Sequence, residues 1–115
     1  MKVVYASRTG NVEKLVQKVG ATDTLKIKDG TESVDGDYVL FTYTDGKGIV
    51  PKPVAEFLEA NPGIKAVVGS GNQQWHGDTF NFAAQKIADQ YDVPVIAKVD
   101  GEGTDADVET IKAAL

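Results

Sequence analysis

Five residues near the start of the chain, at positions 7–11, have the types and spacing needed to hold a phosphate group. They follow a short apolar run at 3–6 and precede an amphipathic stretch that begins at Val12. A strand that ends in Ser, Thr, Gly and Asn where a helix begins leaves backbone N–H groups free at the positive end of the helix. The spacing differs from the Walker loop and from the Gly-x-Gly-x-x-Gly dinucleotide turn. Because Ser, Thr and Asn also cap ordinary helices, the segment predicts either a phosphate cradle or a plain helix cap.

Two later loops hold residues suited to a flat aromatic ligand. Residues 43–48 contain two glycines, which let the backbone approach a ring and present its N–H and C=O groups. Residues 70–78 contain the only Trp and the only His of the chain, Trp75 and His76. A loop Trp is suited to stack on an aromatic ligand, although it is also typical of a rim that covers a sheet edge.

The apolar pattern predicts strands that alternate with helices. Strands are predicted at 2–6, 24–28, 38–43, 64–70 and 93–99. Helices are predicted at 11–19, from Pro51 to Glu59, from an Asp78 cap to about Tyr91, and at 105–115, with 29–37 as a polar connection without a helix.

This alternation predicts an α/β fold of the flavodoxin-like kind. We expect a three-layer sandwich with a five-stranded parallel sheet, right-handed crossovers and the strand order 2-1-3-4-5. The strand at 24–28 alternates apolar and charged residues, which is typical of a strand near the sheet edge. In this order the loops after strands 1, 3 and 4 meet at the carboxyl edge of the sheet, which is where a ligand is expected.

Composition limits the possible functions. The 115 residues predict one domain, residues 1–115, without room for a second. The net charge of −5 argues against a nucleic-acid surface. The chain has no Cys, so redox work would require a bound cofactor. We find no apolar run long enough to span a bilayer and no secretory signal, which predicts a cytoplasmic protein.

Four segments resemble the NrdI family, small FMN flavodoxins that accompany class Ib ribonucleotide reductase. They are residues 7–12, 42–51, 70–80 and 103–109, which follow the order and spacing of the family. The resemblance implies FMN as cofactor and, in the reduced protein, a reaction with oxygen that supplies superoxide to the reductase small subunit. There the oxidant acts on a dimanganese centre so that a tyrosyl radical forms. The chain would then be an activating partner rather than a stand-alone enzyme, a monomer when alone, and would need an electron donor for its flavin.

The resemblance also implies roles for individual residues. Those expected at the phosphate are Ser7, Arg8, Thr9, Gly10, Asn11 and Val12. Those expected on one side of the flavin ring are Tyr43, Thr44, Gly46 and Gly48. Those expected on its other side are Asn72, Trp75, Gly77 and Asp78. We also expect Gly71 and His76 of the same loop at the cofactor.

One residue departs from the family pattern. His76 stands between Trp75 and Gly77, where the family usually has Gly directly after the aromatic residue. His76 either extends the loop into solvent or lies near the flavin or the partner, where its titration would make reactivity depend on pH.

Other functions remain on the same scaffold. A general electron-transfer flavodoxin shares the fold and FMN, but its usual acidic surround of the ring is thin here, because Asp45 and Asp78 are accompanied by Lys47. A phosphoacceptor signalling domain needs clustered carboxylates around Mg²⁺, and the first loop has Ser7 and Arg8 instead. A single His and no Cys disfavour a hydrolase triad and a metal site.

Overall fold

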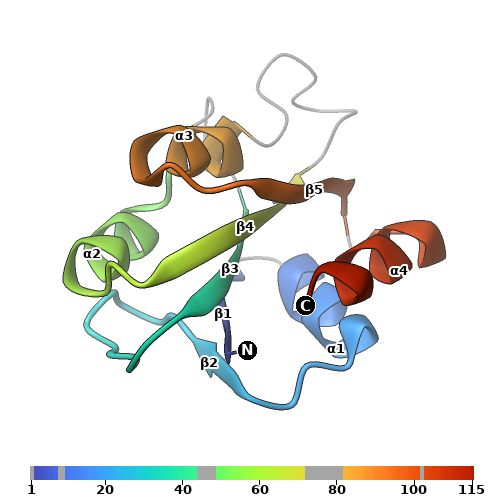
Figure 1. Cartoon of the computed structure of the whole chain (residues 1–115), viewed down its shortest axis with the longest axis horizontal. Helices are drawn as coiled ribbons and strands as arrows, with labels where there is room; N and C mark the ends of the chain where they lie inside the picture. The colour runs from blue at the N-terminus through green and yellow to red at the C-terminus, as the bar shows by residue number, and fades with distance from the viewer. Residues whose placement is uncertain (1, 8–9, 44–48, 72–81, 102) are drawn as a thin grey trace.

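A five-stranded sheet forms the centre of the computed structural model, which describes residues 2–7, 10–43, 49–71, 82–101 and 103–115 (Figure 1). The strands are β1 (Lys2–Tyr5), β2 (Thr24–Lys26), β3 (Tyr38–Tyr43), β4 (Ile64–Gly71) and β5 (Val95–Asp100). The described helices are α1 (Asn11–Val19), α2 (Lys52–Ala60), α3 (Phe82–Tyr91) and α4 (Asp105–Ala114).

The strand order confirms the predicted topology. The sheet runs β2-β1-β3-β4-β5, and every neighbouring pair is parallel. In the register of the sheet, Val4 of β1 lies between Leu25 of β2 and Leu40 of β3. As predicted, β2 is an edge strand. The carboxyl ends of β1, β3 and β4 therefore lie next to one another.

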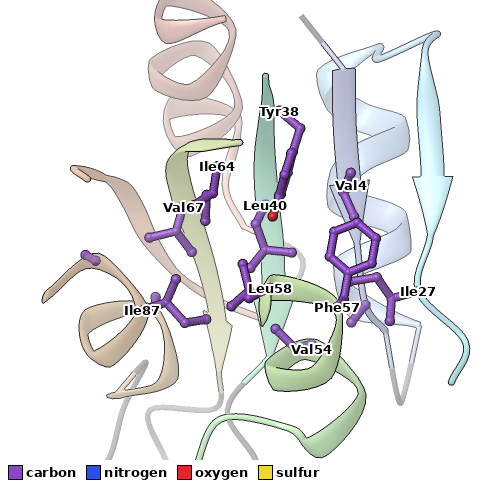
Figure 2. Close-up of a cluster of buried hydrophobic side chains, with 13 residues drawn as sticks. Val4, Ile27, Tyr38, Leu40, Val54, Phe57, Leu58, Ile64, Val67 and Ile87 are labelled. Carbon is purple, nitrogen blue, oxygen red and sulfur yellow. The ribbon is translucent and has the colours of Figure 1, made fainter. Parts of the chain in front are cut away.

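Helices cover both faces of the sheet, so the molecule has three layers (Figure 1). The side chains of α2 and α3 pack on one face, where Phe57 and Leu58 point toward the strands (Figure 2). There the rings of Phe57 and Tyr38 meet edge-on, with centroids 5.5 Å apart and an interplanar angle of 78°. The side chains of α1 and α4 form the second core cluster with the other face, around Leu15 and Phe41.

The connection from β2 to β3 contains no helix, as predicted. The buried side chain of Asn61, just after α2, holds this connection through its amide. Its Oδ1 accepts from the N–H of Val34 at 2.9 Å, and its Nδ2 donates to the carbonyls of Glu32 at 3.1 Å and Phe57 at 3.0 Å. Every polar atom of this buried amide is thus paired, which removes the cost of burying it.

Some predicted boundaries are wrong by a few residues. β5 begins at Val95 rather than at residue 93, because Pro94 has no N–H for the sheet, although its carbonyl accepts from Val67 at 3.1 Å. β2 ends at Lys26, although the N–H of Ile27 still donates to the Tyr5 carbonyl at 2.7 Å, and the chain then enters a turn in which the N–H of Lys28 donates to the Glu32 carboxylate at 2.9 Å. β1 ends one residue earlier than predicted and β4 one residue later. The helix start predicted at Asp78 lies outside the described residues.

Candidate cofactor site

The start of α1 provides the geometry of an anion cradle. Gly10 is the N-cap and has a left-handed backbone with φ of 92°, which Gly adopts without strain. Its N–H donates to Ser7 Oγ at 3.1 Å, and its carbonyl accepts the first helical bond, from Lys14, at 3.0 Å. Gly10 supplies no side-chain cap, and Asn11 is already the first helical residue. The N–H groups of the first turn have no acceptor within the helix and lie at its positive end, where an anion can bind.

The strand register brings the predicted site elements to one edge. The N–H of Ala6 donates to the Phe41 carbonyl at 3.0 Å, so Ser7 leaves the sheet beside the end of β3. Tyr43 pairs with Ser70, one residue before the end of β4 at Gly71. The structure thus places Ser7, Tyr43 and Gly71 at the ends of three neighbouring strands, where the sequence predicted them.

Six of the predicted site residues are described: Ser7, Gly10, Asn11, Val12, Tyr43 and Gly71. The others lie outside the described residues: Arg8, Thr9, Thr44, Gly46, Gly48, Asn72, Trp75, His76, Gly77 and Asp78. The roles expected for the second group stay predictions. Val12 is a buried core residue of α1, so only its backbone N–H is suited to a ligand.

The sequence analysis missed a fourth part of this edge, which follows β5. The N–H of Gly101 donates to the Gly71 carbonyl at 2.7 Å, and Ser70 Oγ donates to the Gly101 carbonyl. A Cβ on Gly101 would lie 3.9 Å from Nδ2 of Asn11. Gly101 therefore lies between the end of β4 and the start of α1. The predicted strand order already put strand 5 beside strand 4, so the residues after strand 5 could have been expected at this edge.

The late segment that resembled the family has a structural role here. Thr104 and Asp107 form a capping box, in which Thr104 Oγ1 accepts from the Asp107 N–H at 3.2 Å and Asp107 Oδ2 accepts from the Thr104 N–H at 2.9 Å. Gly103 lies against α1, with its carbonyl 3.4 Å from Nζ of Lys18. The segment therefore fixes the start of α4 beside α1.

Three side chains form a polar cluster behind the cradle. Glu13 is the acidic residue in the first turn of α1, and its Oε1 lies 3.2 Å from the Tyr5 hydroxyl and 3.4 Å from Nζ of Lys26. Partial burial, with the hydrogen bond and negative charge of Glu13, raises the pKa of the Tyr5 phenol above its usual value. The phenol is therefore a neutral donor at physiological pH.

Metal and membrane sites are not seen in the described part of the chain. Among those residues, no group of three or more His, Asp or Glu side chains is placed to hold a metal ion. No helix of that part is long and apolar enough to cross a membrane.

Comparison with known proteins assigns the family. A family model described as NrdI flavodoxin-like matches residues 3–113. The chain belongs to this family. It is 42% identical over 110 residues to the Protein NrdI of Bacillus licheniformis, covering 95% of this chain and 82% of that protein. It is 38% identical over 110 residues to the Protein NrdI of Macrococcus caseolyticus, covering 95% of this chain and 84% of that protein.

A solved structure shows the fold of this NrdI-family chain independently. The flavodoxin of Streptococcus pneumonia TIGR4 superposes with a TM-score of 0.72 and 24% identity, covering 97% of this chain and 92% of that one. The NrdI flavodoxin-like family implies FMN as the cofactor. The described residues fit its phosphate, because Gly10 opens the first turn of α1 toward an anion and Ser7 holds the turn in place.

Proposed function

We propose that this chain binds FMN at the carboxyl edge of its sheet and, in its reduced form, activates the small subunit of class Ib ribonucleotide reductase. The observation that carries the proposal is the NrdI flavodoxin-like match over residues 3–113, and the adjacent ends of β1, β3 and β4 at one edge of the sheet support it. Residues 1–115 would act as one flavin-binding domain. The partner would hold the dimanganese centre and the tyrosyl radical.

The residues of the first loop would hold the phosphate. Ser7, Gly10 and Asn11 would contribute a hydroxyl, a backbone turn and an amide beside the positive end of α1. Charge-assisted hydrogen bonds of this kind are worth about 1.5–3 kcal/mol each. Arg8 and Thr9 complete this set in the proposal.

The ring would lie between the loops that follow β3 and β4. Tyr43 and Gly71 are the described residues at the entrance to these loops. When bound and reduced, FMN would supply the electron that converts oxygen to superoxide. The chain has no Cys, so its own side chains offer no thiol for the redox step. Their part would be to orient the ring and to shield it from water.

Two exposed apolar side chains support docking of a partner at this edge. Ile49 is 59% exposed and Phe82 is 44% exposed, and each directly follows one of the two loops. Large apolar side chains exposed next to a cofactor site are typical of a surface that a partner covers. An oxidant made at the ring would then be released into a closed interface.

The test is the yield of tyrosyl radical in a manganese-loaded class Ib small subunit. The fully reduced protein and oxygen are expected to produce radical, measured by electron paramagnetic resonance. Free reduced FMN at the same concentration is the control, because it supplies the same electrons without the docking surface. If both give the same yield, the activating role is wrong and a general electron-transfer flavodoxin becomes the better assignment.

A further inference from the structure

The first turn of α1, at which the phosphate is proposed to bind, carries a carboxylate. Glu13 is the third residue of the helix, and it is the acidic residue of that turn. A carboxylate there stabilises the helix through its dipole, but it competes with a second anion for the same positive end. Two negative charges near the same helix end repel each other, more strongly near a protein surface than in bulk water.

The neighbouring strands hold this carboxylate toward the sheet. Tyr5 at the end of β1 donates its hydroxyl to Glu13 Oε1 at 3.2 Å, and Nζ of Lys26 on β2 lies 3.4 Å from the same oxygen. Tyr5 and Lys26 are paired in the register of β1 and β2. Tyr5 is the last residue of β1, which leads into the first loop, and Lys26 is the last residue of β2 beside it.

The same contacts balance the charge of Glu13. Lys26 and Glu13 are 40% and 39% exposed, so solvent screens the pair only in part. The Tyr5 ring is partly buried against the core cluster under α1, which fixes the hydroxyl that Glu13 uses. The carboxylate in the first turn of α1 is therefore part of an ion pair rather than a free charge.

Resting on the proposed FMN site, we propose that Lys26, assisted by Tyr5, is a positioning residue for phosphate recognition. It would hold the Glu13 carboxylate toward β1 and β2 and offset its charge, so that the first turn of α1 accepts the flavin phosphate. Lys26 would then contribute to the preference for FMN over riboflavin, which has the same ring and no phosphate.

The test compares the dissociation constants of FMN and riboflavin, measured by flavin fluorescence at low and at high salt. Lys26→Met is expected to weaken FMN binding on the order of five-fold at low salt and to leave riboflavin binding unchanged. The loss should shrink at high salt, because screening reduces charge repulsion. Unchanged riboflavin binding also shows that the variant is folded.

A second variant separates charge from structure. Glu13→Gln keeps an acceptor for Tyr5 but removes the negative charge, so it is expected to bind FMN at least as tightly as the original protein. The double variant Glu13→Gln with Lys26→Met should regain most of the lost affinity. If Lys26 only supported the fold, Glu13→Gln would weaken both ligands and the double variant would regain nothing.

Lys2→Met is the matched control. It removes the same charge from a surface ion pair, with Asp23 at 3.0 Å, at the opposite end of β1. The ratio of its dissociation constants for FMN and riboflavin is expected to equal that of the original protein. If Lys26→Met kept the original ratio of the FMN and riboflavin dissociation constants, the role of Lys26 would be overturned and the proposed function would stay intact. Equal binding of both ligands by the original protein would overturn the phosphate cradle itself.

Discussion

At the scale of single residues, the turn after β2 depends on a close backbone approach. Gly30 has a φ of +91°, and a Cβ there would lie 2.7 Å from the carbonyl oxygen of Pro53. The turn is closed by Glu32, whose carboxylate accepts from the N–H groups of Lys28 and Gly30 at 2.9 and 3.0 Å. This turn directs the chain away from the sheet edge and across α2.

We expect Gly30→Ala to destabilise the protein by about 3 kcal/mol, since it combines left-handed strain with a steric clash. Gly36→Ala is the matched control, because Gly36 has a φ of +82° but no heavy atom within 4 Å of a built Cβ. It should cost only the strain, about 1–2 kcal/mol. Urea unfolding measures both. If both variants lost the same stability, the steric contact with Pro53 would not contribute to the effect of Gly30→Ala.

The stability of the same turn should depend on pH. Burial alone would raise the pKa of Glu32, but the backbone N–H groups around its carboxylate outweigh it and lower that pKa. A lowered pKa gives stability that is present above the ordinary Glu value of about 4.3 and is lost as the pH falls through the folded-state value.

Glu32→Gln is therefore expected to cost about 1 kcal/mol at neutral pH, and the difference from the original protein should vanish in acid. Glu109→Gln is the control, because Glu109 is 75% exposed and has only a 3.9 Å contact with Lys112. The measurement is the free energy of unfolding of the original protein and of both variants, from neutral to acid pH. A constant difference at all pH values would exclude the carboxylate charge as the cause.

At the scale of elements, the capping box of α4 is part of the site edge. Thr104→Ala removes the Oγ1 that accepts from the Asp107 N–H, which should cost about 1 kcal/mol. Thr110→Ala on the same helix is the control. The Thr110 hydroxyl donates back to the Ala106 carbonyl, a bond that adds little to a helix, so its loss should be neutral or slightly stabilising. Thermal unfolding of the two variants is the measurement, and similar shifts would contradict a capping role.

Much of this fold was predictable because local patterns determine its elements. The prediction for α1 matches the helix at both ends, since four buried apolar residues recur at helical spacing and Gly20 ends it in a left-handed conformation. The bounds of β3 were also correct, because it is a continuous apolar run in the centre of a parallel sheet. The parallel order then predicted which loops meet.

The missed features depend on contacts between distant residues. The end of β2 at Lys26 precedes a turn in which the N–H of Lys28 binds the Glu32 carboxylate and Gly30 lies against Pro53 of α2, a packing contact that the strand pattern does not encode. The position of Gly101 beside the cradle depends on its bonds with Ser70 and Gly71, about thirty residues earlier. No local pattern encodes such a pairing.

At the scale of the whole molecule, the carboxyl edge combines the cradle with exposed apolar side chains. We expect the double variant Ile49→Ser with Phe82→Ser to weaken binding to the reductase small subunit on the order of ten-fold, since both side chains are exposed beside the site. FMN affinity should be unchanged. Leu115→Ser is the control, because Leu115 is 41% exposed and lies after the last helix. Surface plasmon resonance would measure the binding, and an equal loss in the control would remove this edge as the interface.

The hydrogen bond from the Val34 N–H to the Asn61 side chain provides a marker for hydrogen exchange. Val34 lies outside every described helix and strand, yet its N–H donates to a side chain that is only 5% exposed. Loop amides generally exchange with deuterium quickly, because they open without disturbing the core. Val34 would exchange only when the connection between β2 and β3 separates from the end of α2. Its exchange rate would therefore report how often this connection detaches while the rest of the protein stays folded.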